Sequence, residues 1–265
     1  MFHKKHKSAS STLAAILKDW SRKQRLLMAK TPVPAFIGGY PAPFDASLVQ
    51  GLPPNGTKFD IILHHLRFKQ ESLSEVLNDD TIYLTSMRNP MSHFVSTFEF
   101  FYGRFSTLEK MESKSNKGQS LTCWGHPFVD FLGGSGHSIH EYIDKAQDIY
   151  NTNTPWHFRG KNFQAYELGL NTDEITTKRQ RHLAVDNIRN QFDLIMVTEY
   201  YWESLIMMKE IESTAIKIRW FFKLMTVSAN QIASSYFSAN QKARWGYGIS
   251  LDSELKVLDY QIYHF

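Results

Sequence analysis

The fold is decided by the opening stretch of the sequence, MFHKKHKSASSTLAAILKDW, which covers residues 1–20. Its residue types predict a short strand, a tight loop with small hydroxyl residues, and then an amphipathic helix. The first turn of such a helix directs unsatisfied N–H groups and a positive dipole end at the loop. Ser10, Ser11 and Thr12 add hydroxyl donors, and Lys7 adds a mobile charge. The stretch therefore predicts a phosphate-binding loop.

The same residues also have a plainer interpretation. Serine and threonine are the usual N-caps of helices, and Lys4, Lys5 and Lys7 could form a solvated basic strand end. The stretch lacks the G-x-x-x-x-G-K-[ST] spacing of nucleotide triphosphate loops, which disfavours an ordinary kinase or ATPase. On this stretch alone, phosphate binding and plain capping are evenly matched.

A second segment favours the phosphate interpretation. Residues 81–87 are typical of a buried strand, Pro90 ends it, and residues 92–102 then have helical spacing of their phenylalanines. This order places Arg88 at the carboxyl end of a strand, where open α/β sheets bind ligands, and Ser96 about two turns into the helix. A guanidinium suits a phosphate, and a serine adds a donor. Alone, an ion-paired arginine and a packed serine would be the more common explanation.

Together the two segments resemble the phosphosulfate loop and the 3′-phosphate-binding strand–helix of Golgi sulfotransferases, most of all those of the galactose-3-O-sulfotransferase family. That family carries a T-H-K-T-G-S-S-T-like loop, matched by residues 5–12, and an L-R-D-P segment, matched by residues 87–90. Further similar elements follow in the family's order along nearly the whole chain: Gly39-Tyr40-Pro41-Ala42, His65-Leu66-Arg67-Phe68, Tyr166-Glu167-Leu168-Gly169, residues 199–205, Ala243-Arg244-Trp245 and residues 258–265.

The resemblance implies an α/β fold of the sulfotransferase type: a P-loop-like three-layer sandwich with a central, mostly parallel sheet flanked by helices. It also implies that residues 1–265 form a single catalytic domain. Periodicity agrees with this class, because helix-like and strand-like stretches alternate. The predicted helices lie near residues 10–28, 90–102, 137–150, 177–190 and 199–213, and the predicted strands near 59–63, 81–87 and 194–197. Residues 106–136, polar and glycine-containing, are predicted to form an insertion or lid.

The resemblance further implies the reaction and its donor. The donor is 3′-phosphoadenosine 5′-phosphosulfate (PAPS), and the acceptor is the 3-hydroxyl of a terminal galactose on a glycolipid or a glycoprotein glycan. The residues expected to bind PAPS are His6, Lys7, Ser8, Ala9, Ser10, Ser11, Thr12, Arg88 and Ser96. Because sulfuryl transfer depends on in-line positioning and electrostatics, Lys7 is also expected to act catalytically, neutralising the bridging oxygen and the 5′-phosphate.

His65 is the expected base for the acceptor hydroxyl. It follows the apolar strand-like run 59–63, which places it near the ligand-binding edge of the sheet. An imidazole with a near-neutral pKa suits this proton transfer. Adjacent residues of a strand face opposite sides, so only one of His64 and His65 should reach the substrate, and the resembled motif favours His65.

Two positions depart from the family pattern. Ala9 replaces the loop glycine and removes backbone freedom where a left-handed turn is expected. Asn89 replaces the aspartate of the second motif, which loses a charge but keeps a short side chain able to cap the following helix. Since Lys7, Arg88 and Ser96 remain, cofactor binding is expected to survive.

Composition limits the setting. The 265 residues, 42% of them apolar, fit one globular α/β domain, and the net charge of +4 suits an anionic cofactor. One cysteine and no complete ligand pattern among eleven histidines predict no metal site. The sequence has no transmembrane run or signal peptide, whereas family members resemble type II Golgi membrane proteins. We therefore expect a luminal Golgi catalytic domain without its N-terminal anchor and stem, associated with membranes only through that anchor and binding no nucleic acid.

Two other classes of function stay open at this point. A P-loop kinase-like phosphotransferase would share the strand–loop–helix but should show a lysine after glycines and an acidic magnesium ligand, which are not evident. A catalytically silent glycan-binding relative would keep the fold and the basic surface. Neither the carrier of the acceptor galactose nor the oligomeric state follows from the sequence.

Overall fold

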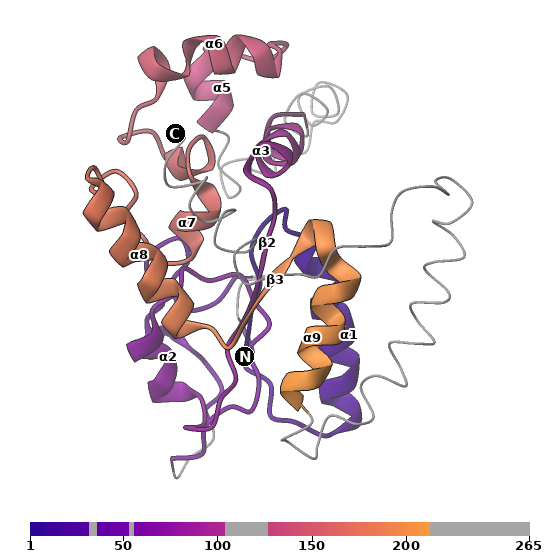
Figure 1. The fold of residues 1–265 in the computed structure, drawn as a ribbon. Helices are drawn as coiled ribbons and strands as arrows, with labels where there is room; N and C mark the ends of the chain where they lie inside the picture. Colours follow the sequence, from indigo (N-terminus) through magenta and orange to yellow (C-terminus); the bar gives the residue numbers. More distant parts are fainter. Residues whose placement is uncertain (32–35, 53–55, 104–126, 213–265) are drawn as a thin grey trace, which may run out of the picture.

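The computed structural model describes residues 1–31, 36–52, 56–103 and 127–212 (Figure 1). The motif pieces at 243–245 and 258–265 and most of the predicted insertion lie outside these residues. The elements in chain order are β1 (Phe2–His3), α1 (Ser10–Lys23), η1 (Ala46–Leu48), α2 (Gln70–Val76), β2 (Leu84–Met87), α3 (Pro90–Phe98), η2 (Glu99–Gly103), α5 (Pro127–Leu132), α6 (Ile139–Ile149), η4 (His157–Arg159), α7 (Phe163–Glu167), α8 (Lys178–Gln191), β3 (Leu194–Val197), η5 (Thr198–Tyr200) and α9 (Tyr201–Glu212).

The described strands form a parallel sheet in the order β1-β2-β3. In the central strand β2, Leu84 lies opposite Phe2 on one side and Leu194 on the other. Asp193 fixes the approach to β3, because its carboxylate accepts a hydrogen bond of 2.7 Å from the backbone N–H of Tyr83. Parallel pairing brings the carboxyl ends of all three strands to one edge of the sheet.

The predicted strand at residues 59–63 is wrong as a regular strand. Ile62 accepts a hydrogen bond of 3.0 Å from the N–H of Phe2, so the segment does extend the sheet beyond β1. However, Phe59 bridges to Leu77 and Ile61 bridges to Met28, each as an isolated pair. Because the partner changes within two residues, no ladder of consecutive hydrogen bonds forms.

Helices cover both faces of this sheet (Figure 1). On one face, α1 and α9 lie side by side and pack Leu13, Leu17 and Leu205 against Phe2 and Met196. On the other face, α2 and α8 enclose a larger apolar cluster. The predicted α/β class, with a parallel sheet flanked by helices, is therefore confirmed.

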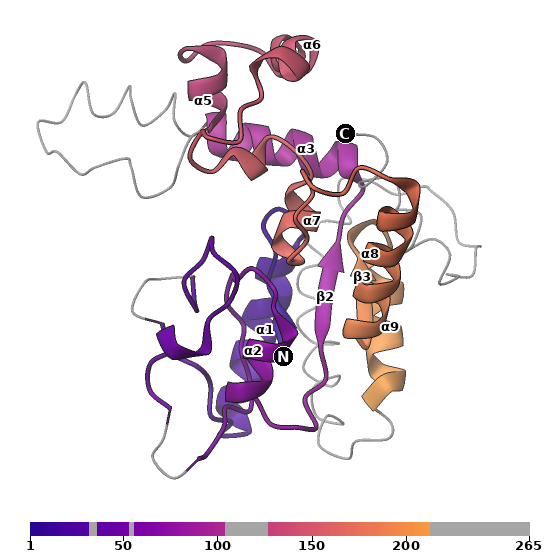
Figure 2. The same ribbon diagram turned by 90° about the vertical axis from the view of Figure 1, so that its left-hand side faces the viewer.

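A third, aromatic cluster lies beyond the carboxyl ends of the strands. There α3, η2, α5 and α6 lie together above the sheet (Figures 1 and 2). Phe98, Phe128 and Tyr142 are buried between these elements, and their rings meet edge-on or tilted at centroid distances of 5.0–6.2 Å. Such contacts add to the hydrophobic gain from burying the rings. The cluster covers the edge at which ligands are expected.

Most helix boundaries follow local signals in the sequence. α3 begins at Pro90, and the side-chain oxygen Oδ1 of Asn89 accepts hydrogen bonds from the N–H groups of Met91 and Ser92, which confirms the expected cap. α1 ends earlier than predicted, at Lys23, because Arg25 adopts a positive φ of 56°. The short helices α2, α5 and α7 were not predicted, since five to seven residues are too few to show a helical period. No described helix is long and apolar enough to cross a membrane.

Gly169 allows the close approach of α7 to the segment before α2. It adopts a φ of +88°, and a Cβ atom there would collide with the backbone carbonyl oxygen of Phe68. The neighbouring N–H of Phe68 donates a hydrogen bond of 2.8 Å to the Glu167 carbonyl. Only glycine combines this φ with this contact.

We predict that Gly169→Ala lowers the free energy of unfolding by about 3 kcal/mol, from a left-handed alanine plus an overpacked contact. Gly133→Ala is the matched control, because Gly133 has a φ of +72° and open space around its Cβ position. It should cost about 1 kcal/mol, the backbone strain alone. Urea unfolding of both variants measures the difference, and equal losses would contradict the proposed collision.

Candidate active site

The loop between β1 and α1 turns sharply with two left-handed residues. Lys7 has a φ of 58° and Ala9 a φ of 55°, and both are residues with a Cβ atom. The left-handed conformation expected where the family has glycine is therefore adopted by Ala9. A left-handed alanine costs about 1–2 kcal/mol, so the surrounding contacts must hold the turn.

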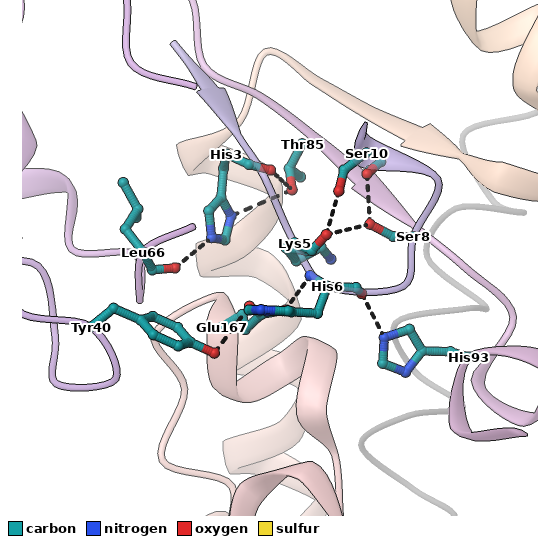
Figure 3. A network of polar contacts seen from close by, with 11 residues as sticks. His3, Lys5, His6, Ser8, Ser10, Tyr40, Leu66, Thr85, His93 and Glu167 are labelled. Carbon is teal, nitrogen blue, oxygen red and sulfur yellow. Dashed lines mark hydrogen bonds and ion pairs between the residues drawn. The ribbon is translucent and has the colours of Figure 1, made fainter. Parts of the chain in front are cut away.

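Hydroxyl groups hold this turn from within. Ser10 donates its hydroxyl to the Lys5 carbonyl (Figure 3). Ser8 Oγ lies 2.8 Å from Ser86 Oγ on β2. Within the part of the chain that the structure describes, no side chain caps α1, whose N-cap residue is Ala9. Plain N-capping is therefore the wrong interpretation of the serine run. The first N–H groups of α1 keep their capacity for an anion, while Ser11 and Thr12 are exposed beside them.

Lys7 and Arg88 meet at the carboxyl edge of the sheet, although 81 residues separate them. The Nη1 atom of Arg88 donates a hydrogen bond of 3.3 Å to the Lys7 carbonyl. The Lys7 ammonium lies 4.3 Å from the centre of the Phe100 ring. Thr198 joins the same edge, since its hydroxyl donates to the Met87 carbonyl at 2.8 Å and to the Ser8 carbonyl at 3.2 Å. The two predicted motifs thus form one site.

The backbone of Arg88 is held in a fixed position. Gln164 accepts a hydrogen bond of 2.9 Å from the Arg88 N–H and donates one of 2.8 Å to its carbonyl. The side chain keeps unused capacity, because its Nε atom is buried and has no hydrogen-bond partner among the residues that the structure describes. Ser96 lies half-buried on α3, and among the described residues no hydrogen bond joins its hydroxyl to Lys7 or Arg88.

His65 lies next to this loop and stacks on His6. The two imidazole rings are 3.7 Å apart between centroids and inclined by only 16°. His65 lies beside the Lys4 backbone, and its Nδ1 atom is buried without a hydrogen-bond partner among the described residues. Burial and the neighbouring His6 hold the pKa of His65 well below its usual range. The near-neutral pKa expected for His65 from the sequence is therefore wrong. The ring is neutral at pH 7 and has a lone pair, but burial makes it a weaker base than an exposed imidazole.

His6 is buried and tied to Glu167 rather than exposed in the loop. The Glu167 carboxylate accepts the His6 backbone N–H at 2.9 Å and lies 2.5 Å from its Nδ1 (Figure 3). The Tyr40 hydroxyl donates to the same carboxylate at 3.3 Å. Burial raises the pKa of Glu167, and burial together with Arg159 lowers the pKa of His6. A carboxylate in this position fixes the tautomer and orientation of an imidazole.

The same three groups do not have the geometry of a metal centre. His6, His65 and Glu167 each offer a ligand atom, and these atoms lie within 4.8 Å of one another. However, the two rings are nearly parallel, so their in-plane lone pairs do not converge on one point. The 2.5 Å between His6 Nδ1 and Glu167 Oε1 is a hydrogen-bond distance, whereas two ligands of a tetrahedral zinc lie about 3.3 Å apart. The absence of a metal stays a prediction.

Several residues at the site were not predicted from the sequence. Glu167 appeared there only as part of a similar motif, and Gln164 and Thr198 not at all. Arg159 is also buried here, with its guanidinium 3.8 Å from the centre of the Phe101 ring. The one sequence signal that could have indicated Glu167 and Arg159 is a charged residue within an otherwise apolar segment. A buried carboxylate or guanidinium requires partners, so such a residue marks a site where other polar groups gather.

Buried imidazoles give the fold an acid-sensitive stability. Burial is the main cause that lowers the pKa of His3 to about 4 and that of His93 to about 3. Both values lie below the unfolded value near 6.5, so the unfolded chain binds more protons as the pH falls. The stabilising contribution of these two histidines is therefore fully present above pH 6.5 and is lost progressively as the pH falls below that value. The raised pKa of Glu167 opposes this loss in part.

We predict that His93→Gln reduces the stability difference between pH 7.5 and pH 5.5 by about 1.4 kcal/mol, the contribution of one such histidine. His182→Gln, at an exposed position of α8, is the control and should leave the difference unchanged. Urea unfolding at the two pH values measures it. An unaltered pH dependence in His93→Gln would show that this imidazole does not contribute.

Comparison with known proteins agrees with these motifs. Residues 1–123 match the family model described as galactose-3-O-sulfotransferase. Galactosylceramide sulfotransferase of Homo sapiens is 28% identical over 231 residues, which cover 84% of this chain and 47% of the relative. Galactose-3-O-sulfotransferase 2 of Homo sapiens is 24% identical over 244 residues, covering 92% and 55%. Galactose-3-O-sulfotransferase 3 of Mus musculus is 24% identical over 216 residues, covering 79% and 43%.

The chain spans about half the length of the curated relatives that it matches. No solved structure matches it. The family-model match includes the loop with Lys7, the segment with His65 and the strand end with Arg88, which are the parts that the fold brings to one edge. Over residues 1–123 the chain is therefore similar to the galactose-3-O-sulfotransferase family, and over most of its length it is similar to the curated relatives named above.

Proposed function

We propose that this protein transfers the sulfuryl group of PAPS to the 3-hydroxyl of a terminal galactose on a glycolipid or glycoprotein glycan. The observation that carries the proposal is the meeting of Lys7 and Arg88 at the carboxyl edge of a parallel sheet. The Arg88 guanidinium there contacts the backbone of Lys7, two residues before Ala9, the N-cap residue of α1, which makes no side-chain capping hydrogen bond. That set suits a ligand with two anionic ends.

The described residues have distinct roles in this proposal. Lys7 and the first N–H groups of α1 bind the 5′-phosphosulfate, while Arg88, whose Nε atom is buried without a partner, binds the 3′-phosphate. Ser11 and Thr12 are exposed and add donors, and Ser96 adds one from α3. Ser8, Ala9 and Ser10 shape the loop, because their contacts are internal. His6 contributes by holding the loop against Glu167.

Proton transfer is assigned to His65. Its neutral imidazole takes the proton from the acceptor hydroxyl as the oxygen attacks sulfur, and Lys7 stabilises the negative charge that develops on the departing phosphate oxygen. No metal is required by these steps. We place the protein in the sulfotransferase fold, a P-loop-like three-layer sandwich in which residues 1–265 form one catalytic domain. Its proposed location is the Golgi lumen.

We predict that Arg88→Ala weakens PAPS binding about 10- to 100-fold, because a charge-assisted contact to a phosphate is lost. Arg22→Ala is the control, since Arg22 is exposed in the last turn of α1. Calorimetric titration of the full chain with PAPS measures both variants. Unchanged affinity in Arg88→Ala would remove this residue from the cofactor site.

We predict that His65→Ala lowers kcat for sulfate transfer about 10²- to 10⁴-fold and leaves PAPS affinity intact, as expected for a lost general base. A radiolabelled-sulfate assay across galactose-terminated acceptors, with the product linkage determined, measures it. His182→Ala serves as the surface control. Retained turnover in His65→Ala would exclude His65 as the base.

The same two measurements separate the alternative functions. PAPS binding without transfer in the unaltered protein would indicate a silent glycan-binding relative. Binding of ATP in preference to PAPS would indicate a kinase-like phosphotransferase.

A further inference from the structure

A groove of about 300 Å³ runs along one side of α1, apart from the cluster around Glu167. Its wall on α1 contains Ser11, Ala14, Ala15 and Lys18, which share one face of the helix because they are spaced three, four and seven residues from the first. The remaining lining residues come from the neighbouring chain segments: Lys4, Met28, Leu63 and His64.

The groove meets the candidate active site at Ser11, but the histidines of the two places are different. His65 lies beside the Lys4 backbone and stacks on His6, whereas the neighbouring His64 lines the groove. Adjacent residues of an extended chain face opposite sides, so His65 faces the candidate active site and His64 faces the groove. The Lys4 backbone contacts His65, and the Lys4 side chain lines the groove.

The charges at the groove are all of one sign. Lys4 and Lys18 line it, no carboxylate does, and within the described ranges neither lysine forms an ion pair. Burial and the nearby Lys18 lower the pKa of Lys4. Burial, Lys4 and Lys18 lower the pKa of His64 to about 4. The His64 Nδ1 atom is buried, and no described residue forms a hydrogen bond with it. Two ammonium groups beside an unpartnered imidazole repel each other unless an anion lies between them.

We propose that this groove binds the oxyanion of a sulfate or phosphate group, held by Lys4, Lys18 and His64. Two ammonium groups and an imidazole N–H match the several acceptor oxygens of such a group. The apolar lining from Ala14, Met28 and Leu63 leaves room for the carbon skeleton of an ester. The site borders the proposed PAPS site at Ser11, but its charged groups are Lys4 and Lys18 rather than Lys7 and Arg88, and it does not depend on sulfate transfer.

The test is a titration of the full chain with inorganic sulfate. Binding is monitored through the NMR signal of the His64 ring. His64→Gln assigns the signal. Saturable binding should shift it and raise the pH at which His64 titrates, because an anion favours the imidazolium form. Lys4→Gln and Lys18→Gln should each weaken the apparent affinity about three- to ten-fold, as expected for one partly exposed charge.

Lys23→Gln is the matched control, because Lys23 lies on the same helix and is ion-paired with Asp19 at 2.8 Å. It should leave the titration unchanged. Equal weakening in Lys23→Gln and Lys18→Gln would overturn the proposal, since it would indicate unspecific ionic screening. The absence of a saturable shift would overturn it as well. Near-ultraviolet circular dichroism of each variant checks that it is folded.

Arg88→Ala separates this groove from the proposed PAPS site. The sulfate titration of His64 should be the same in Arg88→Ala, and its loss there would overturn the proposal by placing the anion at the cofactor site. A second titration with a galactose sulfate monoester identifies the source of the group. Tighter binding of the ester than of inorganic sulfate would support a sugar-linked group, and equal affinities would support a free ion in the same groove.

Discussion

The hydrogen bonds from His6 to the buried carboxylate of Glu167 are the constraint on which the rest of this structure depends. Glu167 is fully buried, and a buried carboxylate is costly unless donors surround it. The backbone N–H and the ring of His6 both contact it, and the Tyr40 hydroxyl adds a third contact. The opening loop is thereby joined to α7, 161 residues away. Because the loop is held there, its left-handed residues Lys7 and Ala9 can be maintained.

This attachment also determines the state of the nearby imidazoles. His6 is enclosed by the rings of Phe36, Tyr40, Phe101 and Phe163 as well as by His65. Such surroundings disfavour a second proton on either ring, so both stay neutral at physiological pH. A neutral, oriented imidazole has the lone pair that a general base needs, while the burial that keeps it neutral also lowers its basicity and makes the fold sensitive to acid. Stability and the proposed chemistry therefore have one physical origin.

The parallel sheet brings Lys7 and Arg88 together, although they are far apart in the sequence. β1 and β2 both end at the edge covered by α3 and η2, so the residues that follow them, Lys7 and Arg88, come within hydrogen-bond distance. On the opposite face of the same chain segment, α1 and His64 leave a groove of purely positive charge. One chain segment, His64-His65, thus contributes to both the proposed active site and the proposed anion groove, because adjacent side chains of an extended segment face opposite sides.

The sequence by itself determined the α/β class, the strand at β3, the start of α3 with its Asn89 cap and the family resemblance, since each rests on short-range order and periodicity. It also placed Lys7 and Arg88 at one edge, because parallel strands align their carboxyl ends. Only the tertiary structure decided that Ser8 and Ser10 turn inward, that His6 pairs with Glu167 and that residues 59–63 form isolated bridges. Those outcomes depend on partners far along the chain, and the local pattern contains no information about which distant donor meets a buried carboxylate.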